Sequence, residues 1–233
     1  MKNISFLIGV AFLVISCSVK NKVSDIEMKH KEKLNYPTLT NETELFDIST
    51  FGENKTEVST INGDTIYHHY NQQSYEEVDN KRNLLKSFSR SSDDGTISGY
   101  DYSVNPILGI YKEFFSNGQI KVKGVFCYYG FRVGKWLYYN NEGLLTDTID
   151  YDLCYTFNTD DIINFCKENK VPLEKVTFGH RTSIYKKKTP DGKCVWVIRY
   201  PRQDIFYYIT LQIDASNGTI LKTERSPFPQ EEY

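Results

Sequence analysis

The side chain best placed to do chemistry in this sequence is the thiol of Cys17. Ile4 to Ile15 form an apolar run of twelve residues behind Lys2, and Ser16 and Cys17 follow directly. Such a run is too short to cross the roughly 30 Å hydrocarbon core of a membrane, which takes about 20 helical residues. Its length and its preceding positive charge are typical of a cleaved signal peptide. Cleavage at the end of this run would leave the Cys17 thiol at or near the new N-terminus.

The residues Val14-Ile15-Ser16-Cys17 resemble the lipobox of bacterial lipoprotein precursors. The resemblance implies a signal peptide over residues 1–16, acylation of Cys17 with palmitate or similar chains, and a protein anchored to a membrane of the cell envelope. The composition, rich in Asn, Lys, Ile and Tyr, is Bacteroidetes-like, and there surface display usually goes with an acidic run after the cysteine. The basic run Ser18–Lys22 therefore favours the periplasmic face of the outer membrane. An ordinary secretory signal with a chance cysteine is the alternative.

The remaining reactive side chains form no catalytic or metal-binding pattern. His68 and His69 are adjacent on a predicted strand, where neighbouring side chains face opposite ways, so at most one could enter a given site. The sequence has no nucleophile elbow, phosphate loop or His-Glu-x-x-His motif. Its formal net charge of −2 gives no basic face for nucleic acid. We therefore predict no enzyme, no cofactor, no metal and no nucleic-acid partner.

Four further cysteines leave the redox state open. An exported chain can form disulfides, and an even number permits two, but the spacing does not give the pairing. The alternative is that these cysteines are small buried thiols. The four are Cys127, Cys154, Cys166 and Cys194.

The stretch before the repeats divides into a tether and a small β region. Residues 17–43 are polar and lysine-rich, which predicts a flexible tether. Residues 44–104 are predicted to contain strands at 46–51 and 84–88, a hairpin around Asn62-Gly63, and a loop over 91–99.

An internal repeat with an offset of 25 residues follows. Each unit predicts a strand with aromatic residues, a tight turn ending in glycine, and a second strand. The matched pairs are Gly109 with Gly134, Tyr111 with Trp136, Phe114 with Tyr139, Gly118 with Gly143, Ile120 with Leu145 and Phe126 with Tyr151.

These two units, over residues 105–153, resemble variant MORN repeats of the kind found in bacterial antitoxin-like proteins and lipoproteins. The resemblance implies stacked β-hairpins in an open sheet that often binds a partner, and it brings no catalytic residue. We take Tyr111, Phe114, Trp136 and Tyr139 as the candidate partner-binding surface.

The C-terminal part changes character. Residues 160–169 predict a helix, capped by Thr159 or Asp160, and strands are predicted at 183–187, 194–200, 206–214 and 219–222. A helix, a strand carrying Trp196 and a strand ending Ile213-Asp214-Ala215 resemble a PepSY-like α+β domain over residues 154–226. Such domains are generally exported and non-enzymatic, and some restrain proteases. The sequence departs from the pattern of these domains at Pro201, where the strand that carries Trp196 runs into a proline, so the pairing of that strand is left open.

The expected fold is mainly β, or α+β. Antiparallel hairpin repeats are followed by one helix packed on an antiparallel sheet. We expect a lipid-anchored, non-enzymatic module that binds a protein partner, with an immunity protein against an exported toxin as one concrete form. A regulator or inhibitor of an envelope protease and a structural envelope component are the alternatives.

Overall fold

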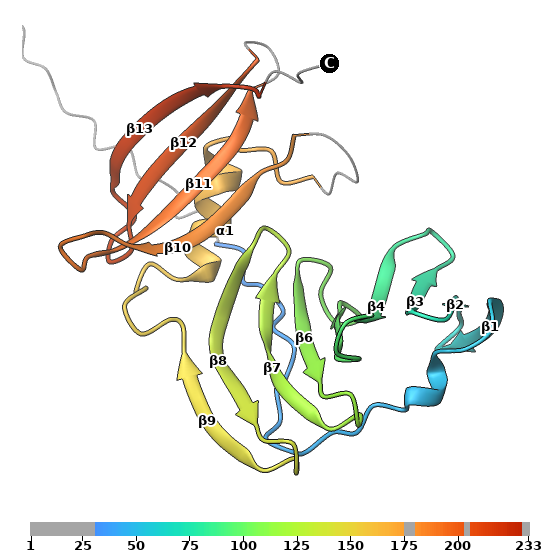
Figure 1. Cartoon of the computed structure of the whole chain (residues 1–233). Helices are drawn as coiled ribbons and strands as arrows, with labels where there is room; N and C mark the ends of the chain where they lie inside the picture. Colours follow the sequence, from blue (N-terminus) through green and yellow to red (C-terminus); the bar gives the residue numbers. More distant parts are fainter. Residues whose placement is uncertain (1–30, 175–179, 203–205, 230–233) are drawn as a thin grey trace, which may run out of the picture. The chain divides into compact units, whose positions relative to one another are not determined.

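The computed structural model describes residues 31–174, 180–202 and 206–229, and the predicted lipidation site at Cys17 lies outside them. The described chain is mainly β: a nine-stranded antiparallel sheet, one α-helix and a four-stranded antiparallel sheet follow one another in the sequence (Figure 1). The fold class expected from the sequence is confirmed. No described helix is long and apolar enough to cross a membrane.

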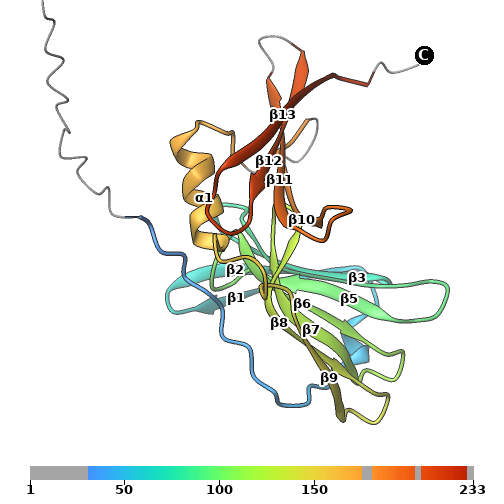
Figure 2. The ribbon, with the colours of Figure 1, turned by 90° about the vertical axis from the view of Figure 1, so that its left-hand side faces the viewer.

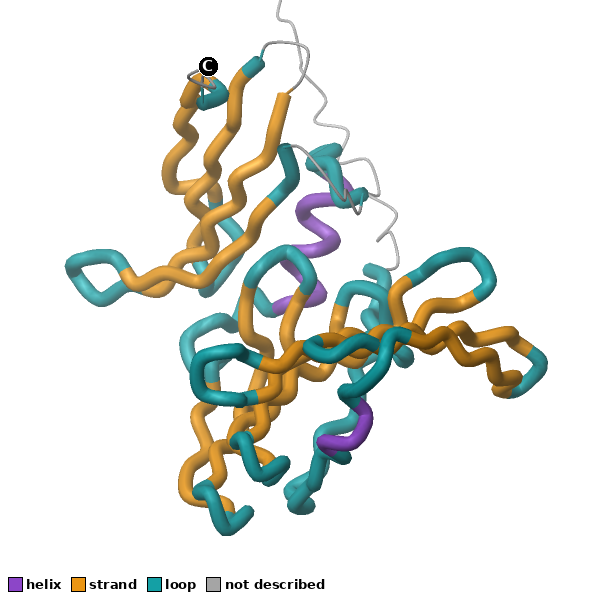
Figure 3. The backbone as a smooth tube through the Cα atoms, turned by 45° about the vertical axis from the view of Figure 1, so that its right-hand side comes forward, coloured by secondary structure: helices purple, strands orange, loops and turns teal. Residues whose placement is uncertain are grey.

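The nine-stranded sheet is a meander in which every strand pairs with its neighbour in the sequence (Figure 3). The N-terminal β region and the two repeats therefore share one sheet. Its strands are β1 (Lys55–Ile61), β2 (Asp64–Tyr70), β3 (Ser74–Asp79), β4 (Leu84–Arg90), β5 (Ile97–Asp101), β6 (Leu108–Phe114), β7 (Ile120–Cys127), β8 (Phe131–Tyr139) and β9 (Leu145–Asp150).

The predicted turns are present. Asn62 and Gly63 connect β1 to β2 with φ values of 51° and 89°, the pair of positive angles that a two-residue type I′ hairpin requires. The corresponding turns of the two repeats end in Gly118 and Gly143, at φ values of 85° and 80°. The 25-residue offset thus reflects two successive hairpins, β6–β7 and β8–β9.

The N-terminal β region differs from the prediction in two places. Residues 46–51, predicted as a strand, contain the 3₁₀ helix η1 (Ile48–Thr50), because the Asp47 carboxylate accepts the Ser49 N–H and caps it. Strand β3 was not predicted, since Glu76, Glu77 and Asp79 interrupt its apolar pattern, and β5 begins inside the predicted loop 91–99.

The helix α1 (Thr159–Glu168) lies where the sequence predicts one, but its N-cap is Asn158 rather than Thr159 or Asp160. The Asn158 side chain accepts the Asp161 N–H at 3.2 Å, and the Asp161 carboxylate accepts the Asn158 N–H at 3.1 Å. This reciprocal capping box fixes the start of the helix.

The second sheet has the order β10 (Ser183–Lys188), β11 (Cys194–Arg202), β12 (Tyr207–Asp214) and β13 (Ile220–Pro227). Pairing continues through Pro201, which lies opposite Tyr208. Strand β10 reaches only as far as Arg199. Among the described residues, Pro201 therefore has a neighbouring strand on one side only, and a missing N–H is tolerated at such an edge.

One core cluster joins the two sheets: it combines side chains of β6 to β8 with others from α1 and β10 to β12, among them Phe131, Ile163 and Trp196. A disulfide links Cys154, after β9, to Cys194 at the start of β11. Cys127 and Cys166 are buried free thiols. Both states left open by the sequence therefore occur, a bridge for one pair and buried thiols for the other.

Candidate binding surface on the nine-stranded sheet

The four aromatic residues predicted as a partner-binding surface lie on opposite faces of the sheet. Tyr111 and Trp136 stack on one another, with ring centroids 5.5 Å apart and planes 23° from parallel. Phe114 and Tyr139 belong to a core cluster on the other face and are only 3% and 5% exposed. Trp136 is also buried, at 1% exposed. The four residues therefore do not form one accessible surface, and only Tyr111 is partly exposed.

We term the two sides of β5 to β8 the groove face, which carries Tyr111, Glu113 and Trp136, and the strap face, which carries Lys112 and Phe114. Successive strand residues point to opposite faces of the sheet. A strand that alternates aromatic and charged residues therefore contributes side chains to both faces. A repeat matched at a three-residue spacing, as Tyr111 and Phe114 are, necessarily takes one residue from each face.

The strap face is covered by residues 31–47, which we term the N-terminal segment (Figure 2). The Phe46 ring packs against Phe88 and Phe114, with centroid distances of 5.4 and 5.3 Å. Nearer its start, the Leu34 N–H donates to the Asp160 carboxylate at 3.1 Å. Residues 31–43, which the sequence assigns to a tether, thus make contacts with both α1 and the nine-stranded sheet.

A buried lysine holds the middle of this segment. The Lys123 side chain is 1% exposed, and its ammonium donates to the Glu42 carbonyl at 2.6 Å and to the Glu44 carboxylate at 2.9 Å. Lys112 donates to the same carboxylate. Burial alone would raise the pKa of Glu44, but the hydrogen bonds from both lysines outweigh it and hold that pKa below its ordinary value.

On the groove face, the Trp136 indole lies directly on the β7 backbone. A Cβ added to Gly124 would come within 2.3 Å of the ring, so only glycine permits this approach. The indole N–H donates to the Val125 carbonyl at 3.1 Å. Trp136 therefore forms the floor of the groove face rather than an exposed anchor.

Aromatic rings run across the groove face from strand to strand. Tyr100 contacts both Tyr111 and Phe126, with centroid distances of 5.2 and 5.6 Å. A concavity of about 400 Å³ opens over these rings. Its lining comes entirely from β5 to β8: Tyr100, Tyr111, Glu113, Lys121, Val122, Phe126, Arg132, Trp136 and Tyr138. We term this concavity the groove.

Polar groups border the rings. The Lys121 ammonium pairs with the Glu113 carboxylate at 2.6 Å, and the Tyr111 hydroxyl donates to the same carboxylate at 3.1 Å. Burial, with the nearby Glu113 charge, raises the pKa of Tyr111 to about 12. Its hydroxyl is therefore a neutral hydrogen-bonding group at physiological pH. An aromatic floor with a polar border is suited to holding a ligand.

Seven groove residues were not identified from the sequence as a site: Tyr100, Glu113, Lys121, Val122, Phe126, Arg132 and Tyr138. Phe126 was matched to Tyr151 in the repeat, which was the available signal. Tyr100 lies on β5, outside both repeat units. Arg132 has no cationic counterpart, since Ile107 occupies the equivalent place 25 residues earlier.

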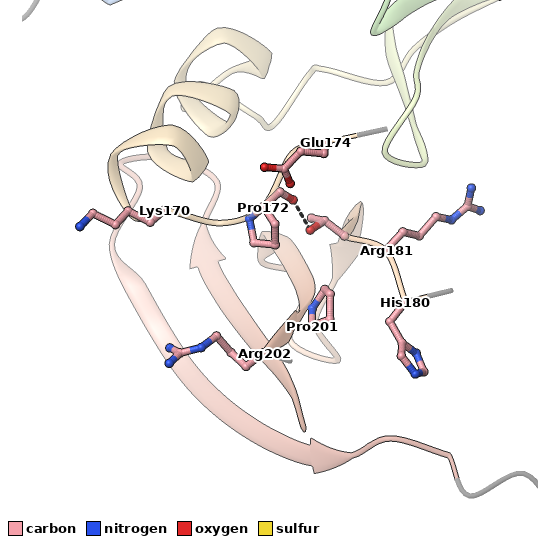
Figure 4. A pocket seen from close by; sticks show the side chains of 8 residues that line it. Lys170, Pro172, Glu174, His180, Arg181, Pro201 and Arg202 are labelled. Atoms are coloured by element: carbon pink, nitrogen blue, oxygen red, sulfur yellow. Dashed lines mark hydrogen bonds between the residues drawn. The ribbon is translucent and has the colours of Figure 1, made fainter. Parts of the chain in front are cut away.

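A second depression of about 350 Å³ lies beside the end of β11 (Figure 4). Half of its lining is Lys, Arg or His; the lining consists of Lys170, Pro172, Glu174, His180, Arg181, Thr182, Pro201 and Arg202. Figure 4 shows the Lys170 and Arg202 side chains extending to one side and the Arg181 side chain to the opposite side. These charges do not converge on one point, so the groove is the better candidate site.

Between the two sheets, Lys186 fills a structural position. Its ammonium donates to the Arg132 carbonyl at 2.8 Å and to the Asp152 carboxylate, and it lies 5.1 Å from the centre of the Trp196 ring system. Burial lowers its pKa, although Asp152 opposes that effect. Lys186, on β10, thus helps to hold the start of β8 next to β10.

The two adjacent histidines face opposite ways, as the strand periodicity predicts. His68 contacts the Ser59 hydroxyl at 2.7 Å and the Tyr75 hydroxyl at 3.2 Å, whereas His69 contacts the Thr56 hydroxyl at 3.1 Å. Within the described ranges, no group of three or more His, Cys, Asp or Glu side chains is arranged to hold a metal ion.

No protein-family model matches the chain, and no curated protein is significantly similar to it.

Proposed function

We propose that this protein is an exported lipoprotein of the cell envelope, anchored through lipid on Cys17, that binds a protein partner in the groove without catalysing a reaction. The observation that carries the proposal is the groove itself: partly exposed Tyr100, Tyr111 and Phe126 over a rigid aromatic floor. Such rings supply large contact areas and few rotatable bonds, which favours protein recognition.

Two further observations support the location. The apolar run before Cys17 is typical of a lipoprotein signal. The disulfide between Cys154 and Cys194 fits an oxidising compartment outside the cytoplasm. An immunity protein against an exported toxin is one form of this function, because such a protein needs a binding surface and no chemistry.

Comparative proteomics of cross-linked cells tests the proposal. Tyr100→Thr with Phe126→Thr removes two partly buried groove rings, while Tyr67→Thr with Tyr207→Thr removes two more exposed rings elsewhere, at 37% and 41%. We expect an envelope protein that co-purifies with the wild type and the control pair and is lost from the groove pair. The same partners on all three proteins, at equal thermal stability, would contradict the proposal.

A further inference from the structure

Arg132 lies in the groove with its guanidinium close to two aromatic rings. The guanidinium carbon is 4.4 Å from the ring centre of Trp136 and 4.8 Å from that of Tyr151. Its Nη1 donates to the Tyr138 hydroxyl at 3.2 Å and to the Tyr151 hydroxyl. The orientation of this charged group is therefore fixed before any ligand arrives.

The charge of Arg132 is not neutralised within the described part of the chain. Nearby Lys121 and Lys186 are paired with Glu113 and Asp152, but the ion pairs among the described residues include none with Arg132. Its side chain is nevertheless exposed at the groove. An arginine without a carboxylate in such a place has a net attraction for an anion.

The hydrogen bonds of Arg132 leave room for that anion. Both bonds that it makes to described residues come from Nη1, so the edge with Nη2 and Nε remains for another acceptor. Two parallel N–H donors on a guanidinium match the two oxygens of a carboxylate. The tyrosine hydroxyls that accept from Nη1 help to set the direction of that edge.

The surface next to the guanidinium is apolar. Tyr100 and Phe126 form the neighbouring wall, and the whole groove has a volume of about 400 Å³. This volume is that of a few side chains, not of a folded element. The ligand chemistry that satisfies both parts is a carboxylate next to an aromatic or aliphatic side chain.

We propose that the groove is a carboxylate-recognition site, in which Arg132 binds an aspartate, a glutamate or a chain terminus in an extended segment of a partner protein, and an adjacent apolar side chain of that segment packs on Tyr100 and Phe126. This inference rests on the proposed function and names the chemistry of the partner.

The test is selection from a display library of random twelve-residue peptides on the mature chain carrying Cys17→Ser. We expect enriched peptides with an acidic residue beside an apolar one. Binding of these peptides should weaken about 10- to 100-fold when Arg132 is changed to Gln, or when the peptide carboxylate is changed to an amide. Arg132→Lys keeps the charge but loses the planar fork, and it should restore only part of the affinity.

Other outcomes contradict different parts of the proposal. Enriched peptides without acidic residues, or with equal affinity for Arg132→Gln, would remove the carboxylate site and leave a protein-binding groove. Failure to enrich any peptide would contradict the groove as a site for an extended segment as well. Arg132-dependent binding to vesicles of phosphatidylethanolamine and phosphatidylglycerol, without peptide binding, would instead assign the anion to a lipid headgroup. Arg225→Gln serves as the matched control, since Arg225 is an exposed arginine on β13 and does not line the groove.

Discussion

The Trp136 indole rests on the backbone of Gly124, at a point where any side chain would meet the ring within 2.3 Å. This contact makes the groove floor from two residues of adjacent strands, and Tyr111 and Arg132 both lie against the indole, at 5.5 and 4.4 Å from its ring centre. Gly124 and Trp136 are therefore expected to be energetically coupled.

The coupling predicts the outcome of a double-mutant cycle. Trp136→Ala should lower the free energy of unfolding by about 3–5 kcal/mol, as large-to-small changes of buried aromatic residues do. Gly124→Ala should be strongly destabilising in the wild type and much less so beside Trp136→Ala, because the ring that it would meet is gone. Urea denaturation of the four proteins measures both effects. Strictly additive changes would contradict this contact.

Lys123 and Lys121 differ in burial by a wide margin, which gives a matched pair of variants. The Lys123 side chain is 1% exposed and that of Lys121 is 38% exposed. Lys123→Met should cost about 1–3 kcal/mol, because it leaves the Glu42 carbonyl without its donor. Lys121→Met should cost less than about 1 kcal/mol. Hydrogen exchange should also increase at residues 42–44 in Lys123→Met alone; unchanged exchange there would show that Lys123 does not hold the N-terminal segment.

The disulfide predicts a specific labelling pattern. Iodoacetamide added in denaturant without reductant should modify Cys127 and Cys166 but not Cys154 and Cys194. In the native protein burial raises the pKa of Cys127 and Cys166 to about 12, so both should resist modification. Changing Cys154 and Cys194 together to Ser should cost about 2–4 kcal/mol. Peptide mass spectrometry checks the labelling, and modification of all four thiols would contradict the bridge.

Asp214 predicts a pH dependence of stability. Hydrogen bonds from Lys193 and Ser216 lower the pKa of this carboxyl to about 2. Because the folded-state pKa is depressed, the contribution of Asp214 is complete above its ordinary pKa of about 4 and is lost as the pH falls towards 2. Asp214→Asn should therefore be less stable than the wild type at pH 7, and the difference should narrow in acid. A difference that is constant with pH would contradict this assignment.

The turns and the helix could be predicted from the sequence because residues close together in the chain determine them. Asn62-Gly63 predicted its hairpin because both positions need positive φ, and the 25-residue offset predicted two hairpins. The helix was predicted from its apolar periodicity, although its cap was placed one or two residues too late. Asn158 was overlooked because its partner Asp161 was read only as an acidic residue in the first turn.

The division of the site between two faces could not be predicted in the same way. The repeat pattern does not distinguish Tyr111 from Phe114. In a strand, however, the two side chains point to opposite faces of the sheet. Which face is covered depends on where the N-terminal segment packs. That segment is polar and lacks periodicity, and its attachment depends on Lys123, which is 79 residues from Glu44 in the sequence. The sequence did not identify Arg132 as a site residue, because its proposed role depends on contacts with the rings of Trp136, Tyr138 and Tyr151.

Photocross-linking in living cells tests whether the groove face binds a protein in the cell envelope. Benzoylphenylalanine would replace Tyr100 in the groove or, as a control, Tyr67 on β2, which is 37% exposed. A groove that binds a protein should give a discrete cross-linked species from position 100 in the membrane fraction, absent from position 67 and reduced by Arg132→Gln. Cross-linking that is absent from position 100, or the same from both positions, would contradict it.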